Sequence, residues 1–438
     1  MNTPEKKELL QKDLFTRYAE DPIAADKAVF GRVAEADRRG FLRGAGLATM
    51  SALLGATIPF ARSMPEGFIP VALAEEAAPP LPAGKEELIS RGDRPLNLET
   101  PVHLLDDAVT PTERHFVRNH GTVPEGNPET WTLTIDGEVD NPLTLSLKDL
   151  QTKFAPVTRQ LIIECGGNGR FQFTPPVKGN QWTYGAVGCA NWTGVPLAAL
   201  LEAARVKSSA VYTAHYGADR DLSDPNKIPV SRGIPIEKAM NPFTLVAFEM
   251  NGAPLHPLNG APLRLVVPGW VGSASHKWLT RIQLRDVVHD GPGMIKGSYR
   301  MPDRPLEPGE EVAEGVLSKI ITAMPVKSLI TAPQTGVKVA KESPLVVQGH
   351  AWAGEQVVQS VDLSIDFGAT WQPTVLAPPV NPYAWQHWRA EVFFPAPGYY
   401  EVWARATDAR LVSQPFAVAW NPKGYLNNAI HRIAVRVA

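Results

Sequence analysis

The chain has little cysteine and no excess of charge of either sign. Its 438 residues include only two cysteines, Cys165 and Cys189, so a scaffold held by several disulfides is excluded and one bridge between these two stays open. The 43 basic and 45 acidic residues give a formal net charge of −2, and no basic stripe indicates nucleic acid. Beyond one N-terminal run, no apolar segment suggests a membrane span. We therefore expect no nucleic acid and no membrane among its partners.

Several short catalytic signatures are also absent. The sequence has no G-x-x-x-x-G-K-[ST], no H-E-x-x-H, no G-x-S-x-G and no C-x-x-C. Since C-x-x-C-H is missing, we expect no c-type haem on this chain. Proline and glycine are frequent by contrast, at 41 and 35 residues, which favours turns and short strands over long helices.

The N-terminal segment has the pattern of an export signal. Residues 37–43 (DRRGFLR) place two adjacent arginines before Phe-Leu and a third basic residue, and a mildly apolar run follows over residues 44–61. An A-x-A site at residues 72–74 predicts cleavage before Glu75. A retained anchor or a buried helix is the alternative, but the glycines and hydroxyl side chains in the run favour a cleaved leader. Because twin-arginine export moves folded chains, we predict a periplasmic protein that receives its cofactor before export.

The pattern after the leader changes character near residue 325. Residues 77–101 are proline-rich and polar, which is typical of an extended arm. Residues 130–325 are mixed, with strand-like stretches at 131–135, 161–164, 210–214, 245–248 and 263–267 and helix-like stretches at 196–204 and 236–240. From there on, apolar and polar residues alternate between turn signals, over 343–349, 357–367, 389–394 and 399–407. The sequence predicts a signal peptide (1–74), an α+β catalytic domain (75–325) and an immunoglobulin-like β-sandwich (326–438).

The strongest local signal for chemistry is the stretch LIIECGGNGR, residues 161–170. An apolar strand ends in Cys165, and three glycines then allow the backbone to approach another group closely. A thiolate in such a loop suits a soft metal centre or a nucleophile. A structural cysteine, or one bridged to Cys189, is the alternative that local composition leaves open.

Two further sequence blocks bear on whether Cys165 is a functional or a structural cysteine. FVRNH (116–120) is a compact cluster of hydrogen-bonding residues, and RLVVPGWVGSASHKWL (264–279) is a strand that runs into a glycine-serine turn. Together with the cysteine loop they resemble the sulfite oxidase family of molybdenum enzymes. The resemblance covers nearly the whole mature chain and extends to residues 182–194 and to the W-N…G…N-A…H-R pattern of residues 420–432.

This resemblance implies a molybdopterin-binding α+β domain followed by an immunoglobulin-like dimerisation domain. It implies that Cys165 ligates molybdenum. The residues implied for the pterin and its phosphate are Phe116, Asn119, His120, Asp219, Arg264, Ser275 and Lys277. Those implied for the substrate pocket are Arg118, Arg170, Trp182, Tyr299 and Lys423. The chemistry agrees, since arginine forks match an oxyanion in bidentate geometry and a tyrosine hydroxyl donates to it without adding charge.

Three positions depart from the family pattern. Gly272-Ser273-Ala274 stands where many members have Gly-Ala-Arg, and Asn259 stands where a histidine is expected. Lys423 replaces the arginine of W-N-x-R-G, which keeps the charge and loses the fork. These departures favour a likeness to the bacterial periplasmic sulfite and sulfane dehydrogenases over the animal enzymes.

The resemblance predicts a sulfite dehydrogenase that converts sulfite and water to sulfate, two protons and two electrons. The electrons would pass singly to a separate c-type cytochrome. Within the family, the rivals are a sulfane dehydrogenase of the thiosulfate-oxidising system and, less favoured, a sulfoxide reductase. A non-catalytic immunoglobulin-like binding protein would explain residues 326–438 and leave the cysteine and arginine motifs unexplained.

The resemblance also predicts a homodimer assembled through residues 326–438. The alternation of the strands there leads us to expect aromatic side chains on the outer faces of the sandwich, where they would bury area between two copies. The residues concerned are Trp352, Trp371, Trp385 and Trp388. Filling of the sandwich core is the alternative for some of them.

Overall fold

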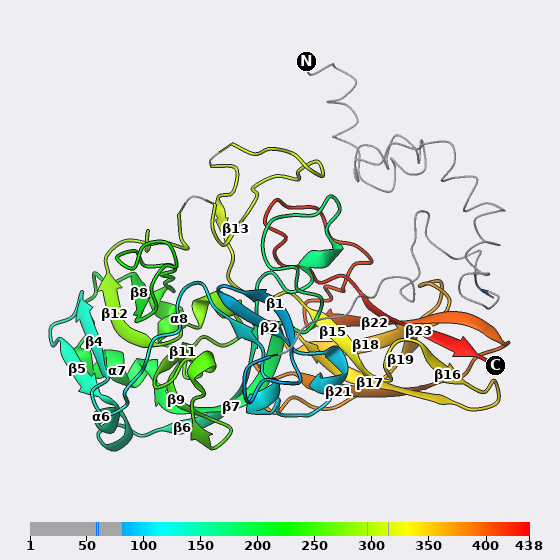
Figure 1. Cartoon of the computed structure of the whole chain (residues 1–438), viewed down its shortest axis with the longest axis horizontal. Coiled ribbons are helices and arrows are strands. Elements are labelled where there is room, and N and C mark those ends of the chain that lie inside the picture. Colours follow the sequence, from blue (N-terminus) through cyan, green and yellow to red (C-terminus); the bar gives the residue numbers. More distant parts are fainter. Residues whose placement is uncertain (1–57, 59, 61–80, 296, 314) are drawn as a thin grey trace, which may run out of the picture.

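The computed structural model describes residues 58, 60 and 81–438, except residues 296 and 314 (Figure 1). The twin-arginine motif and the A-x-A site lie outside the described residues. Strands dominate the described part of the chain, and its α-helices are short. No helix in this part is both long and apolar enough to cross a lipid bilayer.

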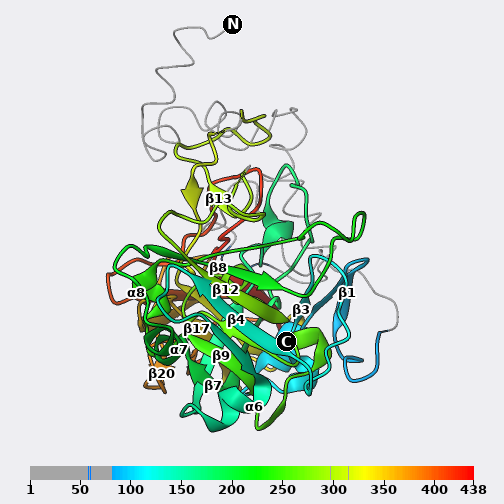
Figure 2. The same ribbon diagram turned by 90° about the vertical axis from the view of Figure 1, so that its left-hand side faces the viewer.

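Three sheets build the half of the molecule that ends with β12 (Figures 1 and 2). The first sheet has the order β1 (Ile89–Asp93), β2 (Leu96–Glu99), β3 (Val117–Arg118). The second has the order β10 (Ala253–Pro254), β9 (Leu245–Met250), β7 (Val187–Pro196), β6 (Val157–Glu164), with β11 (Arg264–Val266) also paired to β9. The third has the order β5 (Leu143–Ser146), β4 (Thr132–Gly137), β12 (Leu279–Arg285), β8 (Tyr212–Gly217).

Short helices cover the sheets of this half. They are α6 (Leu147–Thr152), α7 (Leu197–Ala204) and α8 (Ile236–Ala239). Helix α7 follows Pro196 and contains mostly strong helix formers, and it buries Leu197, Leu200, Leu201 and Ala204 in the core shared with β4 and β12. The connections include five 3₁₀ turns: η3 (Val102–Leu105), η4 (Thr112–Arg114), η5 (Arg170–Gln172), η6 (Pro257–Asn259) and η7 (Gly272–Ala274).

Two sheets face each other in the C-terminal half, on the right of Figure 1. One has the order β15 (Lys327–Ala332), β17 (Leu345–Trp352), β21 (Gln386–Val392), β20 (Val375–Leu376). The other has the order β16 (Val337–Val339), β23 (His431–Val437), β22 (Gly398–Asp408), β18 (Val358–Ser364), β19 (Gln372–Pro373). Apolar residues of both sheets form one buried core between them. The short ribbon of β13 (Arg300–Met301) and β14 (Lys319–Ile320) lies in the connection between the halves.

A buried ion pair joins the halves immediately before Cys165. The Glu164 carboxylate, at the end of β6, accepts from Nζ of Lys327 at 2.5 Å and from Nε1 of Trp352 at 2.8 Å. It also accepts from Nδ2 of Asn168 at 3.0 Å, and the Glu164 and Lys327 side chains are only 4% and 7% exposed. The cysteine loop is therefore fixed to the C-terminal sandwich by charge-assisted hydrogen bonds.

Most of the sequence-based expectations for individual elements are confirmed. All five strand-like stretches of the first half overlap strands, and both helix-like stretches correspond to α7 and α8. The expectation of an extended arm is wrong for residues 81–101. That segment contains the β1–β2 hairpin, and its Lys85 and Glu99 side chains are fully buried against the first half.

The expected exposure of the sandwich tryptophans is wrong for three of the four. Trp388 is fully buried in the core between the two sheets. Trp352 and Trp385 are 2% and 4% exposed and belong to the apolar cluster at the junction of the halves. Only Trp371 is half-buried, with the guanidinium of Arg405 over its ring. The strand alternation was sound, but it could not indicate that one outer face is covered by the other half.

We predict that Lys327→Met lowers the free energy of unfolding by about 3–5 kcal/mol, because it leaves the Glu164 carboxylate buried without a cation. Urea denaturation followed by tryptophan fluorescence measures the change. The double variant Glu164→Gln/Lys327→Met should recover part of the loss, since no unpaired charge remains. Lys153→Met is the matched control, because Lys153 pairs with Asp149 at the surface. Equal stability of Lys327→Met and this control would contradict the prediction.

Candidate functional site

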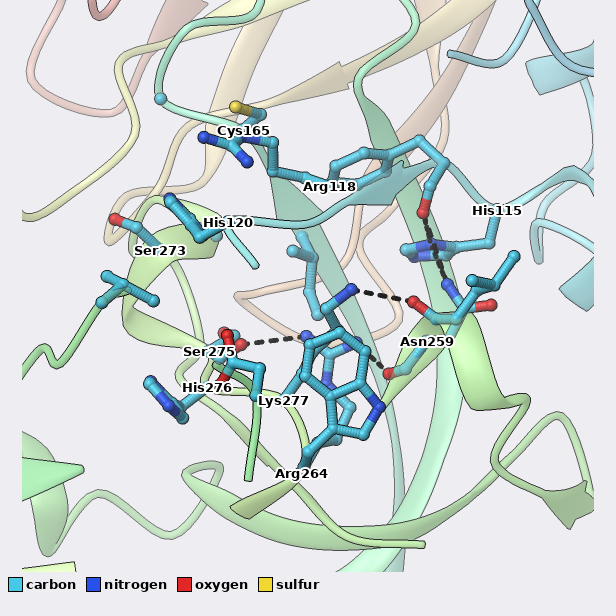
Figure 3. A pocket seen from close by; sticks show the side chains of 18 of the residues that line it. His115, Arg118, His120, Cys165, Asn259, Arg264, Ser273, Ser275, His276 and Lys277 are labelled. Carbon is cyan, nitrogen blue, oxygen red and sulfur yellow. Dashed lines mark hydrogen bonds between the residues drawn. The ribbon is translucent and has the colours of Figure 1, made fainter. Parts of the chain in front are cut away.

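A cavity with about 720 Å³ of empty space, open in part to solvent, lies at the junction of the elements of the first half (Figure 3). Its walls come from segments far apart in the sequence. The residues that line it are His115, Phe116, Arg118, His120, Ile163, Cys165, Gly166, Asp219, Val230, Leu258, Asn259, Arg264, Gly272, Ser273, Ser275, His276, Lys277, Trp278 and Tyr299.

Cys165 reaches this cavity from the first position after β6. The residue is half-buried and its thiol is free. Its backbone N–H donates to the Ala186 carbonyl at 2.9 Å, and its carbonyl accepts from the Asn168 N–H at 2.9 Å. The turn that follows needs glycine, because a Cβ on Gly167 would lie 2.2 Å from Nη2 of Arg170. The loop therefore holds the sulfur in one place, as a metal ligand or a nucleophile requires.

Cys189 lies apart from this site, and no disulfide joins the two cysteines. Cys189 is fully buried on β7, opposite Ile162 of β6, and its thiol is free. Burial raises the pKa of the Cys189 thiol to about 12. The bridge that the sequence left open is thus not present, and at neutral pH Cys189 stays a neutral thiol in the core.

Two cations of the cavity are held by neutral groups. Nη1 of Arg264 donates to the Asn259 carbonyl at 2.8 Å and Nη2 to the Ser275 carbonyl at 3.1 Å. The Lys277 ammonium donates to Oδ1 of Asn119 and, at 2.9 Å, to the Leu258 carbonyl. Burial lowers the pKa of Arg264 to about 9, and burial together with the charge of Arg264 lowers the pKa of Lys277 well below its ordinary value.

Asp219 is the one carboxylate among the lining residues, which also include the cations Arg118, Arg264 and Lys277. Burial raises its pKa to about 6, and the charge of Lys277 acts in the opposite direction. The lining therefore carries more positive than negative charge at neutral pH. Such an imbalance is costly in a buried site unless an anion occupies it.

Unsatisfied polar atoms also indicate that the cavity holds a polar ligand. Nε2 of His115 and Nδ2 of Asn119 are buried and have no hydrogen-bond partner. Buried polar groups are nearly always paired, so these atoms indicate space for a polar ligand. The donors and cations of the cavity fit a phosphate-bearing anionic cofactor.

The metal-ligating side chains are sparse by comparison. Within residues 81–438 as described, no group of three His, Cys, Asp or Glu side chains is arranged to hold a metal ion. A metal at Cys165 would therefore take its other ligands from a cofactor. A soft thiolate beside an anion-binding cavity is consistent with molybdenum carried by a molybdopterin.

His120 and Tyr299 are hydrogen-bonded to each other at the wall of the cavity. Nε2 of His120 contacts the Tyr299 hydroxyl, and burial is the main reason that the pKa of His120 falls and that of Tyr299 rises. Both side chains are neutral at pH 7. The Tyr299 ring also stacks on Tyr425, with ring centroids 5.6 Å apart. Each of these two neutral side chains can donate a hydrogen bond to a ligand, or accept one from it, without adding charge to the cavity.

The predicted site residues divide into two groups. Phe116, Arg118, His120, Cys165, Asp219, Arg264, Ser275, Lys277 and Tyr299 line the cavity, and Figure 3 shows most of them converging on it. Asn119 contacts it through Lys277. Asn119 itself is not part of the lining, and neither are Arg170, Trp182 and Lys423.

Those three residues support the site from outside its walls. Nε of Arg170 donates to the Lys423 carbonyl at 2.9 Å, and Nη1 donates to the Asn180 carbonyl at 2.8 Å. Arg170 thereby ties the cysteine loop to the C-terminal segment. Trp182 is fully buried, with its ring centroid 6.5 Å from that of Phe116. Their predicted contact with substrate stays a prediction.

Sequence reasoning missed several buried polar residues in the lining or directly behind it. His115 and His276 are buried neighbours of predicted residues, and burial lowers their pKa values to about 3 and about 4. Lys85 is also fully buried, and its Nζ donates to Oδ1 of Asn259 at 3.1 Å. His276 lies within the block of residues 264–279, and His115 directly precedes FVRNH. For Lys85 no signal was available, because its partner is 174 positions away.

Comparison with known proteins identifies the family of the chain. The family model described as "Oxidoreductase molybdopterin binding domain" matches residues 120–292, and that described as "Mo-co oxidoreductase dimerisation domain" matches residues 318–438. Sulfite oxidase of Gallus gallus is 34% identical, over 77% of this chain and 76% of that protein. Mitochondrial sulfite oxidase of Drosophila melanogaster is 36% identical, over 78% of this chain.

The chain spans 62% of the length of the Drosophila protein and 64% of that of the Rattus norvegicus enzyme. Among solved structures, the sulfane dehydrogenase SoxCD from Paracoccus pantotrophus is similar, with a TM-score of 0.66 and 28% identity. That likeness covers 78% of this chain and 84% of the other. Two matched domain models and a relative covered over three quarters of its length show that the chain belongs to the sulfite oxidase family of molybdenum oxidoreductases.

Proposed function

We propose that the protein is a sulfite dehydrogenase, which converts sulfite and water to sulfate, two protons and two electrons. The observation that carries this proposal is the fixed Cys165 thiol at a cavity whose lining cations outnumber its one carboxylate. A doubly charged sulfur oxyanion and an anionic cofactor both suit this lining. The sulfite oxidases among its relatives support the choice of substrate.

The cofactor proposed for the cavity is molybdenum bound to molybdopterin. Cys165 would ligate the metal, and the lining residues His120, Asp219, Arg264, Ser275 and Lys277 would hold the pterin and its phosphate, with Phe116 and Asn119 beside them. The bound group would supply oxygen-atom transfer and accept two electrons. The chain itself would exclude bulk solvent and neutralise the charge of the ligands.

Substrate would be bound by positive charge and by a neutral donor. Arg118 lines the cavity on the side of Cys165 (Figure 3). The Tyr299 hydroxyl is hydrogen-bonded to His120. These groups match the oxygens of a small oxyanion. Arg170, Trp182 and Lys423 complete the proposed pocket, with Arg170 fixing the backbone at Lys423.

A sulfane dehydrogenase is the second candidate, favoured by the structural likeness to SoxCD. Both substrates present an anionic sulfur group to the same cations. A sulfoxide reductase is the weaker alternative, since a neutral substrate would leave the excess positive charge of the cavity uncompensated.

The remaining proposals concern the setting of the enzyme. We propose export by the twin-arginine pathway from the motif at residues 37–43, cleavage after residue 74, and action in the periplasm. Electrons would leave to a separate c-type cytochrome, with no haem on this chain. We further propose that residues 75–325 form the catalytic domain and residues 326–438 an immunoglobulin-like sandwich.

The function is tested by steady-state assays with sulfite, thiosulfate and dimethyl sulfoxide, each with cytochrome c or ferricyanide as acceptor. We expect sulfite to give the highest kcat/KM, because it is a small dianion that fits the cationic cavity. Highest turnover with thiosulfate would favour the sulfane dehydrogenase. Reduction of the sulfoxide, with no oxidation of sulfite, would refute the proposal.

The metal ligand is tested with the two cysteines. We expect Cys165→Ser to abolish sulfite turnover and to change the molybdenum electron paramagnetic resonance spectrum, since a soft thiolate ligand is lost. Cys189→Ser is the matched control and should retain most activity and an unchanged spectrum, because that thiol lies in the core. Unchanged spectra and activity in both variants would exclude Cys165 as the ligand.

The assembly is tested by light scattering on the mature protein. We expect a homodimer formed through residues 326–438, in keeping with the dimerisation-domain model matched there. Apolar side chains such as Val375 (78% exposed), Leu411 (72%) and Phe393 (63%) offer surface for this contact, whereas the tryptophans are mostly buried. A mass equal to one chain at every concentration would rule the dimer out.

A further inference from the structure

Arg232 is a fully buried arginine outside the lining of the cavity. It lies between β8 and α8, where its carbonyl accepts from the His215 N–H at 2.9 Å. Nη1 of its guanidinium donates to Oγ of Ser273 at 3.0 Å, and Nη2 donates to the Ile321 carbonyl at 2.8 Å. Nε is buried with no hydrogen-bond partner.

No carboxylate pairs with this guanidinium among the residues that the structure describes. Burial lowers the pKa of Arg232, whereas nearby tyrosines, Tyr299 first, act in the opposite direction. An arginine keeps its charge in proteins, so a full positive charge is buried here against neutral groups. Burying a charge in this way is costly unless something compensates for it. The compensating charge is not on the neighbouring side chains.

The guanidinium lies directly behind the cavity wall. Its Cζ is 4.9 Å from the centroid of the Tyr299 ring, and it donates to Ser273; both residues line the cavity. Figure 3 shows Ser273 on the same side of the pocket as His120, the partner of the Tyr299 hydroxyl. Arg232 thus contacts Ser273 and Tyr299, two hydroxyl-bearing side chains of the lining.

The turn η7 carries no cation of its own. The turn η7 contains Gly272, Ser273 and Ala274, and Ala274 is fully buried in the apolar core. A charge on the wall must therefore come from another segment. Arg232 approaches Ser273 of this turn from a position 41 residues earlier in the chain.

We propose that Arg232 is a positioning residue for anion binding: it supplies the missing positive charge behind η7 and orients the Ser273 and Tyr299 hydroxyls toward a doubly charged oxyanion. The compensating charge for Arg232 is then the bound ligand. The identity of that ligand as a sulfur oxyanion rests on the proposed function. The effect of Arg232 on anion affinity does not depend on turnover.

The test is isothermal titration calorimetry of sulfate with the holoenzyme. We expect Arg232→Gln, which keeps amide donors and removes the charge, to weaken sulfate binding by about tenfold or more, because a unit charge near the ligand is lost. Arg232→Lys retains the charge and loses the fork, so its loss should be smaller. In steady-state assays of Arg232→Gln, the KM for sulfite should rise by a larger factor than that by which kcat falls.

Arg405→Gln is the matched control. Arg405 also lies over an aromatic ring, Trp371, and also has a buried Nε without a partner, but it belongs to β22 of the sandwich. The Arg405→Gln variant should bind sulfate with the same affinity as the wild type. Molybdenum content and thermal unfolding of every variant report on fold and cofactor loading.

Three results would overturn the proposal. One is a sulfate affinity of Arg232→Gln equal to that of Arg405→Gln. Another is absence of sulfate binding by the wild type. The third is an equal loss of molybdenum and of thermal stability in Arg232→Gln and Arg232→Lys, which would assign Arg232 a structural role. If the wild type binds sulfate with the expected dependence on Arg232 and oxidises no sulfite, only the proposed function fails.

Discussion

Buried positive charge without matching carboxylates is the constraint on which the centre of this molecule depends. Arg264 and Lys277 are stabilised by carbonyl and amide oxygens, and Arg264 also lies over the ring of Trp192. Arg232 is held in the same way by Ser273, by a carbonyl and by the face of Tyr299. Neutral acceptors and aromatic faces keep these cations in place and leave their charge available to a ligand.

The position of Cys165 depends on both halves of the chain. Glu164 fixes the end of β6 to Lys327 and Trp352 of the sandwich, and Arg170 holds the carbonyl of Lys423. The C-terminal half therefore contributes to the geometry of a cavity that its own side chains do not line. This coupling gives a physical reason for a sandwich in an enzyme whose chemistry lies in the other half.

Local patterns predicted the elements well where burial follows chain periodicity. The alternation in residues 399–407 corresponds to β22, and the leucine and alanine spacing of residues 196–204 corresponds to α7. Prediction failed where burial depends on a distant segment. The polar character of residues 81–101 did not indicate that Lys85 and Glu99 would be buried. Similarly, the strand pattern around Trp352 and Trp385 did not indicate that the N-terminal half of the molecule covers these two side chains.

The sequence by itself determined the family, because FVRNH, the cysteine loop and the stretch RLVVPGWVGSASHKWL (264–279) occur together and in this order. Nine of the thirteen residues that it assigned to the site line the cavity. Only the tertiary structure decided that Arg170 and Trp182 lie outside the lining, that Cys189 is an unpaired core thiol and that Arg232 reaches the wall at Ser273. These outcomes depend on which segments meet in three dimensions, and the energy of a buried charge is set by its neighbours in space, which periodicity and spacing along one chain do not specify.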